Sequence, residues 1–219
     1  MMMLIAALLY VGVASGAIIN IDHQVDTELE ALNLFNKFNN DTILSIPGDT
    51  INENVSYSNG YLSSWGTLQR TAHCSLYKSQ DSDHLSYDLH IGLKFFATLF
   101  GKIDIGNRDT AGYFQIDDNS VHFGISFTNQ TVCTVALYAL AIERFEKVKF
   151  SVSNGEFEKF DFESFFKTEV FKKVNWILAT LTPTVQTFFQ KGLCNNRSNG
   201  HNHSLKRILI LIQNLFTKF

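Results

Sequence analysis

The residue types that carry out chemistry are scattered along this 219-residue chain, and none forms a known catalytic pattern. No Gly-X-Ser-X-Gly is present, so the sharp turn that exposes a hydrolase serine is missing. No glycine-rich loop leads into Lys-Ser or Lys-Thr, so the phosphate cradle of nucleotide-binding enzymes is missing as well. We therefore predict that the protein is not an enzyme.

Histidines supply the nearest approach to a metal site. His201 and His203 flank one asparagine and could face one ion in an extended chain, but no third ligand follows, so we interpret them as part of a solvated loop. His90 and His122 each occupy the polar side of an alternating strand and could meet across a sheet. We interpret them as surface histidines, and we predict no metal and no cofactor.

Three cysteines are present, and their wide spacing argues against a zinc site. In an oxidising compartment two of the three are expected to pair. We predict a disulfide between Cys74 and Cys133, because both lie in predicted strands. A bond to Cys194 is the alternative, and it would tie down the end of the chain.

The first 17 residues predict a secreted, extracellular protein. Residues 1–17 carry no charged side chain, are apolar as far as Val13 and end in small residues, as a signal peptide does. A buried N-terminal helix is the alternative, whereas a membrane span needs about 20 apolar residues. The chain also carries five Asn-X-Ser/Thr sequons, which predict a glycoprotein; they lie at Asn40, Asn54, Asn129, Asn196 and Asn202.

The amino-acid composition limits the classes of protein to which this chain can belong. The chain is 45% apolar and 18% charged with a net charge of −3, which argues against disorder and against nucleic acid as a partner. Its 20 phenylalanines require burial against one another, a partner or a ligand.

Hydrophobic periodicity predicts an N-terminal helix followed by strands. Apolar residues recur at helical spacing in residues 22–38, and residues 39–60 are polar and predict a loop. Strict alternation from Leu85 to Phe95 predicts a half-buried strand that could continue to about Leu99. We also predict a hairpin of residues 113–116 and 121–127 with a turn at 117–120, and strands at 132–142 and 145–152.

A long helix is predicted from about 163 to 191, with a kink at Pro183 and an end at Gly192. At 1.5 Å per residue it would be about 43 Å long, as long as the diameter of a round domain of this size. We therefore predict an elongated α+β domain at residues 18–194. In it, a long curved antiparallel sheet wraps around the C-terminal helix, and a lipocalin-like β-barrel is the second choice.

Residues 195–219 are predicted to form a polar linker and an amphipathic, basic tail. Leu205, Ile208, Leu209, Ile212 and Leu215 share one helical face. Residues 205–219 could dock on the domain, bind a membrane surface or a protein partner, or belong to a lipid-anchor signal.

The order of these elements resembles that of the mite group 7 allergens, members of the tubular lipid-binding superfamily of takeout, juvenile-hormone-binding and bactericidal/permeability-increasing proteins. The local likenesses are Gly60, the segments LQRTAHC at 68–74 and LHIGLKF at 89–95, and the helical segment ILATLTPTVQTFF at 177–189. The resemblance covers roughly residues 20–193. It implies a hydrophobic ligand held between a wrapped sheet and a helix, without catalysis.

These observations predict a secreted, non-enzymatic protein that binds a lipid, fatty acid or terpenoid-like molecule in an apolar tunnel. The alternative is a secreted adhesion or immune-interaction glycoprotein with a dry core. The apolar stripes that face the long helix supply the predicted ligand-binding residues, namely Leu89, Ile91, Leu93, Phe123, Ile125, Ile177, Leu178, Leu181 and Val185.

Overall fold

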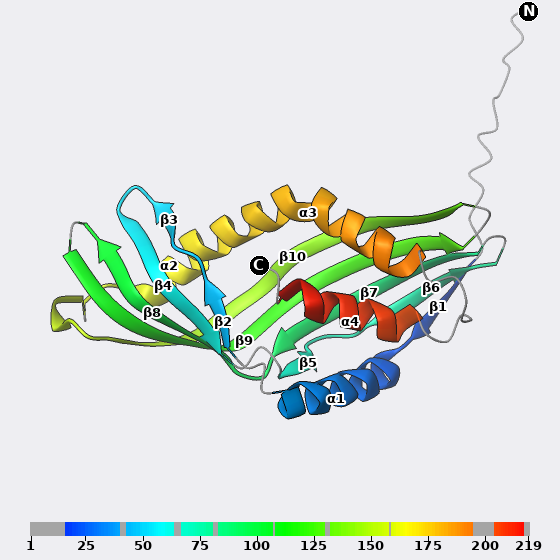
Figure 1. Ribbon diagram of the computed structural model, residues 1–219, viewed down its shortest axis with the longest axis horizontal. Coiled ribbons are helices and arrows are strands. Elements are labelled where there is room, and N and C mark those ends of the chain that lie inside the picture. The colour runs from blue at the N-terminus through cyan, green and yellow to red at the C-terminus, as the bar shows by residue number, and fades with distance from the viewer. Residues whose placement is uncertain are drawn as a thin grey trace, which may run out of the picture.

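The computed structural model describes residues 16–39, 43–63, 67–80, 83–106, 108–129, 132–157, 159–194 and 204–216. Residues 1–15 of the predicted signal peptide, the sequons at Asn40, Asn196 and Asn202, and His201 and His203 lie outside these ranges. Within them, an N-terminal helix, an antiparallel sheet and a long C-terminal helix form one elongated α+β body (Figure 1). The predicted fold class is therefore confirmed.

The sheet contains ten strands in the described ranges, in the order β1-β6-β7-β9-β8-β4-β2, with β10 on β9, β3 on β4 and β5 on β7. The strands are β1 (Gly16–Asn20), β2 (Ile43–Ile46), β3 (Asp49–Asn52), β4 (Val55–Ser63), β5 (Leu68–Arg70), β6 (Ser75–Ser79), β7 (His84–Leu93), β8 (Phe96–Ile105), β9 (Arg108–Asn129) and β10 (Cys133–Val152). The described part of the sheet does not close into a barrel, so the lipocalin-like alternative is wrong.

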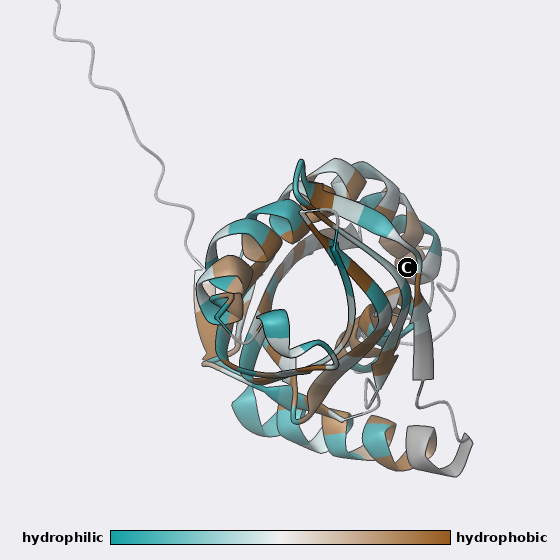
Figure 2. Cartoon of the chain, turned by 90° about the vertical axis from the view of Figure 1, so that its left-hand side faces the viewer, coloured by the Kyte–Doolittle hydropathy of each residue, from teal (hydrophilic) through white to brown (hydrophobic). Residues whose placement is uncertain are grey.

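The 22-residue strand β9 and the 20-residue strand β10 form the spine of the body. β7 pairs with the second half of β9 and β8 with the first half, so β7 and β8 run end to end along one neighbour. The predicted strand from Leu85 to Leu99 is thus interrupted at Lys94 and Phe95. In the end-on view of Figure 2, the strands and the long helix are arranged around a common axis.

The predicted turn at residues 117–120 is wrong, because β9 runs through it without reversing. The buried apolar side chains of β9 fall on even numbers at Phe114 and Ile116 and on odd numbers at Phe123, Ile125 and Phe127. That change of phase resembles a turn in the sequence. In the structure, the break between β7 and β8 at Lys94 and Phe95 lies opposite this change of phase in β9. Because the phase also changes across the break, β7 and β8 both keep their apolar side chains inward.

Two further strand predictions need correction. The strands predicted at 132–142 and 145–152 form one strand, β10, which begins at Cys133 and in which irregularities at Tyr138 and Glu143 break the register with β9. Residues 39–60, predicted to be a loop, contain β2, β3 and the first part of β4. β2 and β3 are only four residues long and both pair with β4 at the edge of the sheet, so neither is long enough to show a clear alternating pattern.

The predicted long helix is present and runs without a break from Phe162 to Cys194. It comprises α2 (Phe162–Phe165), one π-helical turn (Phe166–Val170) and α3 (Phe171–Cys194). Asp161 caps its start by accepting a hydrogen bond from the Ser164 amide at 2.9 Å. The helix continues through Pro183 and past Gly192, so Gly192 does not end it.

Helix α1 (Asp22–Asn39) confirms the N-terminal helix and buries Val25, Leu29 and Leu32. The Asn33 side chain fixes α1 to β5 by bonding to both the amide and the carbonyl of Leu68, at 2.8 and 2.7 Å.

The disulfide joins Cys133 to Cys194, so the predicted bond between Cys74 and Cys133 is wrong. Cys74 is a free thiol, fully buried beside β7, where its sulfur accepts a hydrogen bond from the His90 amide. The observed bond ties the end of α3 to the start of β10.

The tail forms helix α4 (Ser204–Phe216), which docks on the body with Ile208, Leu209 and Ile212 almost completely buried. Figure 1 shows α4 between α1 and α3, on the side of β7. Close contact with α3 depends on Gly192, where a Cβ atom would come within 2.6 Å of the Leu211 side chain. No described helix has the length and apolar character needed to cross a bilayer.

Candidate functional site

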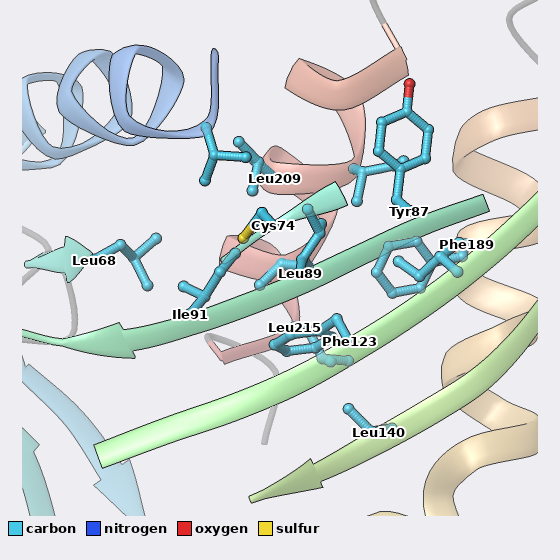
Figure 3. Close-up of a cluster of buried hydrophobic side chains, with 14 of the residues drawn as sticks. Leu68, Cys74, Tyr87, Leu89, Ile91, Phe123, Leu140, Phe189, Leu209 and Leu215 are labelled. Carbon is cyan, nitrogen blue, oxygen red and sulfur yellow. The ribbon is translucent and has the colours of Figure 1, made fainter. Parts of the chain in front are cut away.

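The interior is divided into a filled part and a hollow part. In the filled part, side chains from α1, α3, α4 and strands β5, β7, β9 and β10 form one hydrophobic cluster. Figure 3 shows Leu209 and Leu215 of α4 directed toward Leu89 and Phe123 of the sheet. Helix α4 therefore takes up the space between the sheet and α3 at this end.

The hollow part contains a cavity of about 530 Å³ between the sheet and the long helix. That volume lies in the range of about 300–1,000 Å³ that is usual for small-molecule sites. Eight phenylalanines from the strands, from α2 and from the π-helical turn belong to its lining, and so does Leu215 of α4. The phenylalanines of the lining are Phe96, Phe100, Phe114, Phe123, Phe145, Phe162, Phe165 and Phe166.

Seven of the nine predicted ligand-binding residues line this cavity: Ile91, Leu93, Phe123, Ile177, Leu178, Leu181 and Val185. Leu89 and Ile125 do not; both are fully buried in the filled part. The sequence placed them correctly on the inner face of the sheet. It did not indicate that α4 covers that part of the face.

The cavity reaches the surface beside the turn between β2 and β3. Pro47 and Gly48 of that turn and Asp49, the first residue of β3, are exposed and also belong to the lining. Across from them, Lys173 of α3 lines the cavity and pairs with Asp49 at 3.3 Å. An ion pair therefore joins α3 to β3 at the exposed margin of the cavity.

Thr98 is the unusual polar residue of the cavity wall. It occupies an inward position of β8 between Phe96 and Phe100, and its side chain is almost completely buried. None of the described residues provides a hydrogen-bond partner for its hydroxyl oxygen. Because a buried hydroxyl without a partner costs about 1–3 kcal/mol, Thr98 fits a cavity whose occupant supplies an oxygen or nitrogen atom.

Asn119 also borders the cavity, but its hydrogen bonds stay within the protein. Its side chain accepts from the Leu93 amide at 2.7 Å and donates to the Leu93 carbonyl at 2.9 Å. It therefore replaces ladder bonds at the break between β7 and β8. Asn119 shapes the wall without offering a group to a ligand.

A second polar arrangement lies on the outer face of the sheet. His90 of β7 and His122 of β9 are directly opposite each other, and their rings stack at a centroid distance of 4.7 Å. Asp88 contacts the Nε2 atoms of both rings, at 3.6 Å for His90 and 2.5 Å for His122. Glu143 lies at the other edge, 2.8 Å from His90 Nδ1 and 4.0 Å from His122 Nδ1.

Glu143 is ionised more readily than an ordinary glutamate. Partial burial favours its neutral form, but hydrogen bonds from His90 and Ser120 outweigh that effect and lower its pKa. Ser120 is fully buried and donates to Glu143 at 3.0 Å, and Thr71 lies within 2.6 Å of the Ser120 hydroxyl.

The sequence pattern predicts that His90 and His122 could meet across the sheet, but the prediction did not include their carboxylate partners, Asp88 and Glu143. The alternating pattern puts Asp88 on the same face as His90, so that partner could have been found. Glu143 reaches this face through the irregularity in β10, which the sequence does not reveal. Thr98 could have been found as a polar residue at an inward position of an apolar strand.

Two predicted glycosylation positions fall within the described residues. Asn54 is exposed in the turn between β3 and β4, and Asn129 is the last residue of β9.

Comparison with known proteins leaves the family open. No protein-family model matches the chain, and no curated protein matches its sequence at a significant level. The long antiparallel sheet packed against a long C-terminal helix is compatible with a tubular lipid-binding fold.

Proposed function

We propose that this protein is a secreted, non-enzymatic binding protein for a hydrophobic ligand such as a lipid, a fatty acid or a terpenoid-like molecule. The observation that carries the proposal is the cavity of about 530 Å³, whose lining is almost entirely aliphatic and aromatic. Each methylene that leaves water for such a wall contributes about 0.8 kcal/mol, so an acyl or isoprenoid chain can bind without specific polar contacts.

The resemblance of the sequence to the tubular lipid-binding superfamily supports the same ligand class. The predicted signal peptide supports secretion, and so does the disulfide between Cys133 and Cys194, because such bonds persist in oxidising compartments.

The polar groups of the wall narrow the ligand class. Thr98 offers one hydrogen-bonding group inside the cavity, and Lys173 offers a positive charge at its opening, shared with Asp49. A mostly apolar molecule with an oxygen atom meets these groups best. An adhesion or immune-interaction glycoprotein with a dry core has less support, because the interior around the long helix is not filled by side chains.

Lipid extraction followed by mass spectrometry, together with displacement of a fluorescent fatty acid, tests the proposal on the purified protein. Leu178→Trp should prevent binding of the fluorescent fatty acid, because Leu178 lines the cavity and the larger ring would occupy it. Ala179→Trp is the matched control, because Ala179 is the exposed neighbour on the same helix. Absence of any bound lipid, with no uptake of the probe by the unmodified protein, would refute the proposal.

A further inference from the structure

The outer face of the sheet carries four side chains whose chemistry the lipid-binding proposal does not use: Asp88, His90, His122 and Glu143. Alternation in β7 turns Asp88 and His90 away from the interior, since Leu89 and Ile91 are fully buried on the inner face. His122 is paired with His90 across the strands, and Glu143 contacts the His90 ring from β10. Their side chains remain reachable from solvent, with exposed fractions between 15% for His90 and 38% for Asp88.

We propose that Asp88, His90 and His122 form a binding site for a divalent transition-metal ion such as Zn²⁺. One nitrogen from each ring and one oxygen of Asp88 lie within 4.8 Å of one another. Ligands of a tetrahedral zinc ion lie about 2.0–2.1 Å from the metal, so small side-chain rotations bring these three atoms to one ion. A fourth position is left for water or an exogenous ligand.

The pairing of β7 and β9 places the two histidine rings side by side, in the arrangement that a shared ion requires. His90 and His122 are paired residues of adjacent antiparallel strands, and their rings are within 9° of parallel. Both Nε2 atoms therefore face the same carboxylate, Asp88. Imidazole nitrogens with a carboxylate oxygen form a ligand set that suits zinc and other late first-row metals.

Glu143 completes the arrangement from the opposite edge of the rings. Its carboxylate is 2.8 Å from His90 Nδ1, where it accepts a hydrogen bond and leaves Nε2 free for the metal. Metal-binding histidines commonly donate their second N–H to a carboxylate in this way. Ser120 donates a hydrogen bond to Glu143, and the Thr71 hydroxyl is bonded to Ser120. The irregularity in β10 lies at Glu143.

Charge favours a cation at this position. With neutral imidazoles, the two carboxylates give the group of four side chains a charge of −2, which a divalent ion would balance. The nearby Arg144 does not supply that charge, because it pairs with Asp118 at 3.2 Å and donates to the Thr71 carbonyl at 3.0 Å.

Isothermal titration of the chelator-treated, full-length protein with Zn²⁺ alone tests the proposal. We expect one ion per chain. His90→Ala and His122→Ala should each weaken binding by more than the roughly 10- to 100-fold that loss of an outer hydrogen-bond partner costs. Glu143→Gln, which removes such a partner, should fall within that range.

Two controls separate this site from other histidines. His84→Ala, on the same strand and near the same face, should leave affinity and stoichiometry unchanged. A variant in which His201 and His203 are both alanine should also keep the site. Absorption of bound Co²⁺ reports the ligand set directly, and circular dichroism confirms that each variant is folded. Failure of the unmodified protein to bind Zn²⁺, or binding that His90→Ala and His122→Ala leave intact, would overturn the proposal.

Discussion

At the scale of single residues, Thr98 links the chemistry of the cavity to the choice of ligand. Thr98→Val removes a buried hydroxyl that has no partner among the described residues and keeps the shape of the side chain. The ligand-free variant should therefore be as stable as the unmodified protein, or more stable by about 1 kcal/mol. Its affinity for a long-chain alcohol should fall about 2- to 10-fold, with no change for the alkane of equal length.

Probe displacement by the two compounds measures this difference, and Thr110→Val supplies the contrast. Thr110 is equally buried, but its hydroxyl is 3.1 Å from the Ala111 carbonyl and 3.2 Å from Ser153. Its loss should destabilise the fold without changing ligand preference. Equal losses for alcohol and alkane in Thr98→Val would show that the hydroxyl does not contact the ligand.

The free thiol of Cys74 gives a prediction about pH. Burial raises its pKa to about 11, whereas an exposed cysteine has a pKa of about 8.5. Between these two values the unfolded chain has lost the proton and the folded chain has kept it. The contribution of this group to the free energy of unfolding is therefore full below about pH 8.5 and falls as the pH rises toward 11.

Denaturant titrations at pH 8 and pH 10 measure this loss, which should be smaller in Cys74→Ala than in the unmodified protein. Alkylation at pH 8 gives a second measurement. The native thiol should react only after denaturant is added, because the reactive thiolate is absent and the sulfur is fully buried. Rapid labelling of the native protein would contradict both expectations.

At the scale of elements, Gly192 shows how α4 is held. Gly192→Val would push a side chain into Leu211 of α4, because even a Cβ atom there comes within 2.6 Å of it. We expect a loss of about 1–3 kcal/mol in the free energy of unfolding and faster hydrogen exchange in residues 204–216. Lys191→Val is the control, since Lys191 is exposed on the same turn. Unchanged exchange in α4 would mean that its position does not depend on this contact.

The sequence predicted elements well where one face is buried and poorly where the chain changes phase or lies at an edge. Alternation from Leu85 and helical spacing from Glu163 identified β7 and the long helix, because each element has a single apolar face. The turn predicted at 117–120 failed because a phase change inside one strand and a reversal between two strands leave the same pattern.

The hydrophobic pattern of the sequence also did not predict which distant segments contact one another. Strand propensity suggested that Cys74 and Cys133 pair, whereas the end of α3 brings Cys194 to Cys133. The amphipathic tail suggested several partners, and the structure shows its apolar face against α1 and α3. Such choices depend on which surfaces remain uncovered after the sheet has formed, and a local pattern does not contain that information.

At the scale of the whole molecule, α4 sets the length of the cavity. Leu215 lies at the boundary, since it belongs both to the filled cluster and to the cavity wall. Leu215→Ala should therefore lengthen the cavity and move the preferred acyl chain to a greater length. Displacement by a series of fatty acids measures the preference.

Ile208→Ala is the matched control for that series. Ile208 is fully buried in the same helix but does not line the cavity. Both variants should lose about 2–5 kcal/mol of stability, and only Leu215→Ala should change the preferred length. The same shift in both variants would indicate a general loosening of the fold.

The two long strands of the spine have a thermodynamic consequence. β9 and β10 each contribute side chains to the cluster beneath α4 and to the phenylalanine-rich cluster beneath α2. Both ends of the molecule therefore share β9 and β10, and neither end can unfold while the other remains intact. Calorimetry should therefore record one endotherm whose van't Hoff and calorimetric enthalpies agree, although one end is hollow and the other is solid.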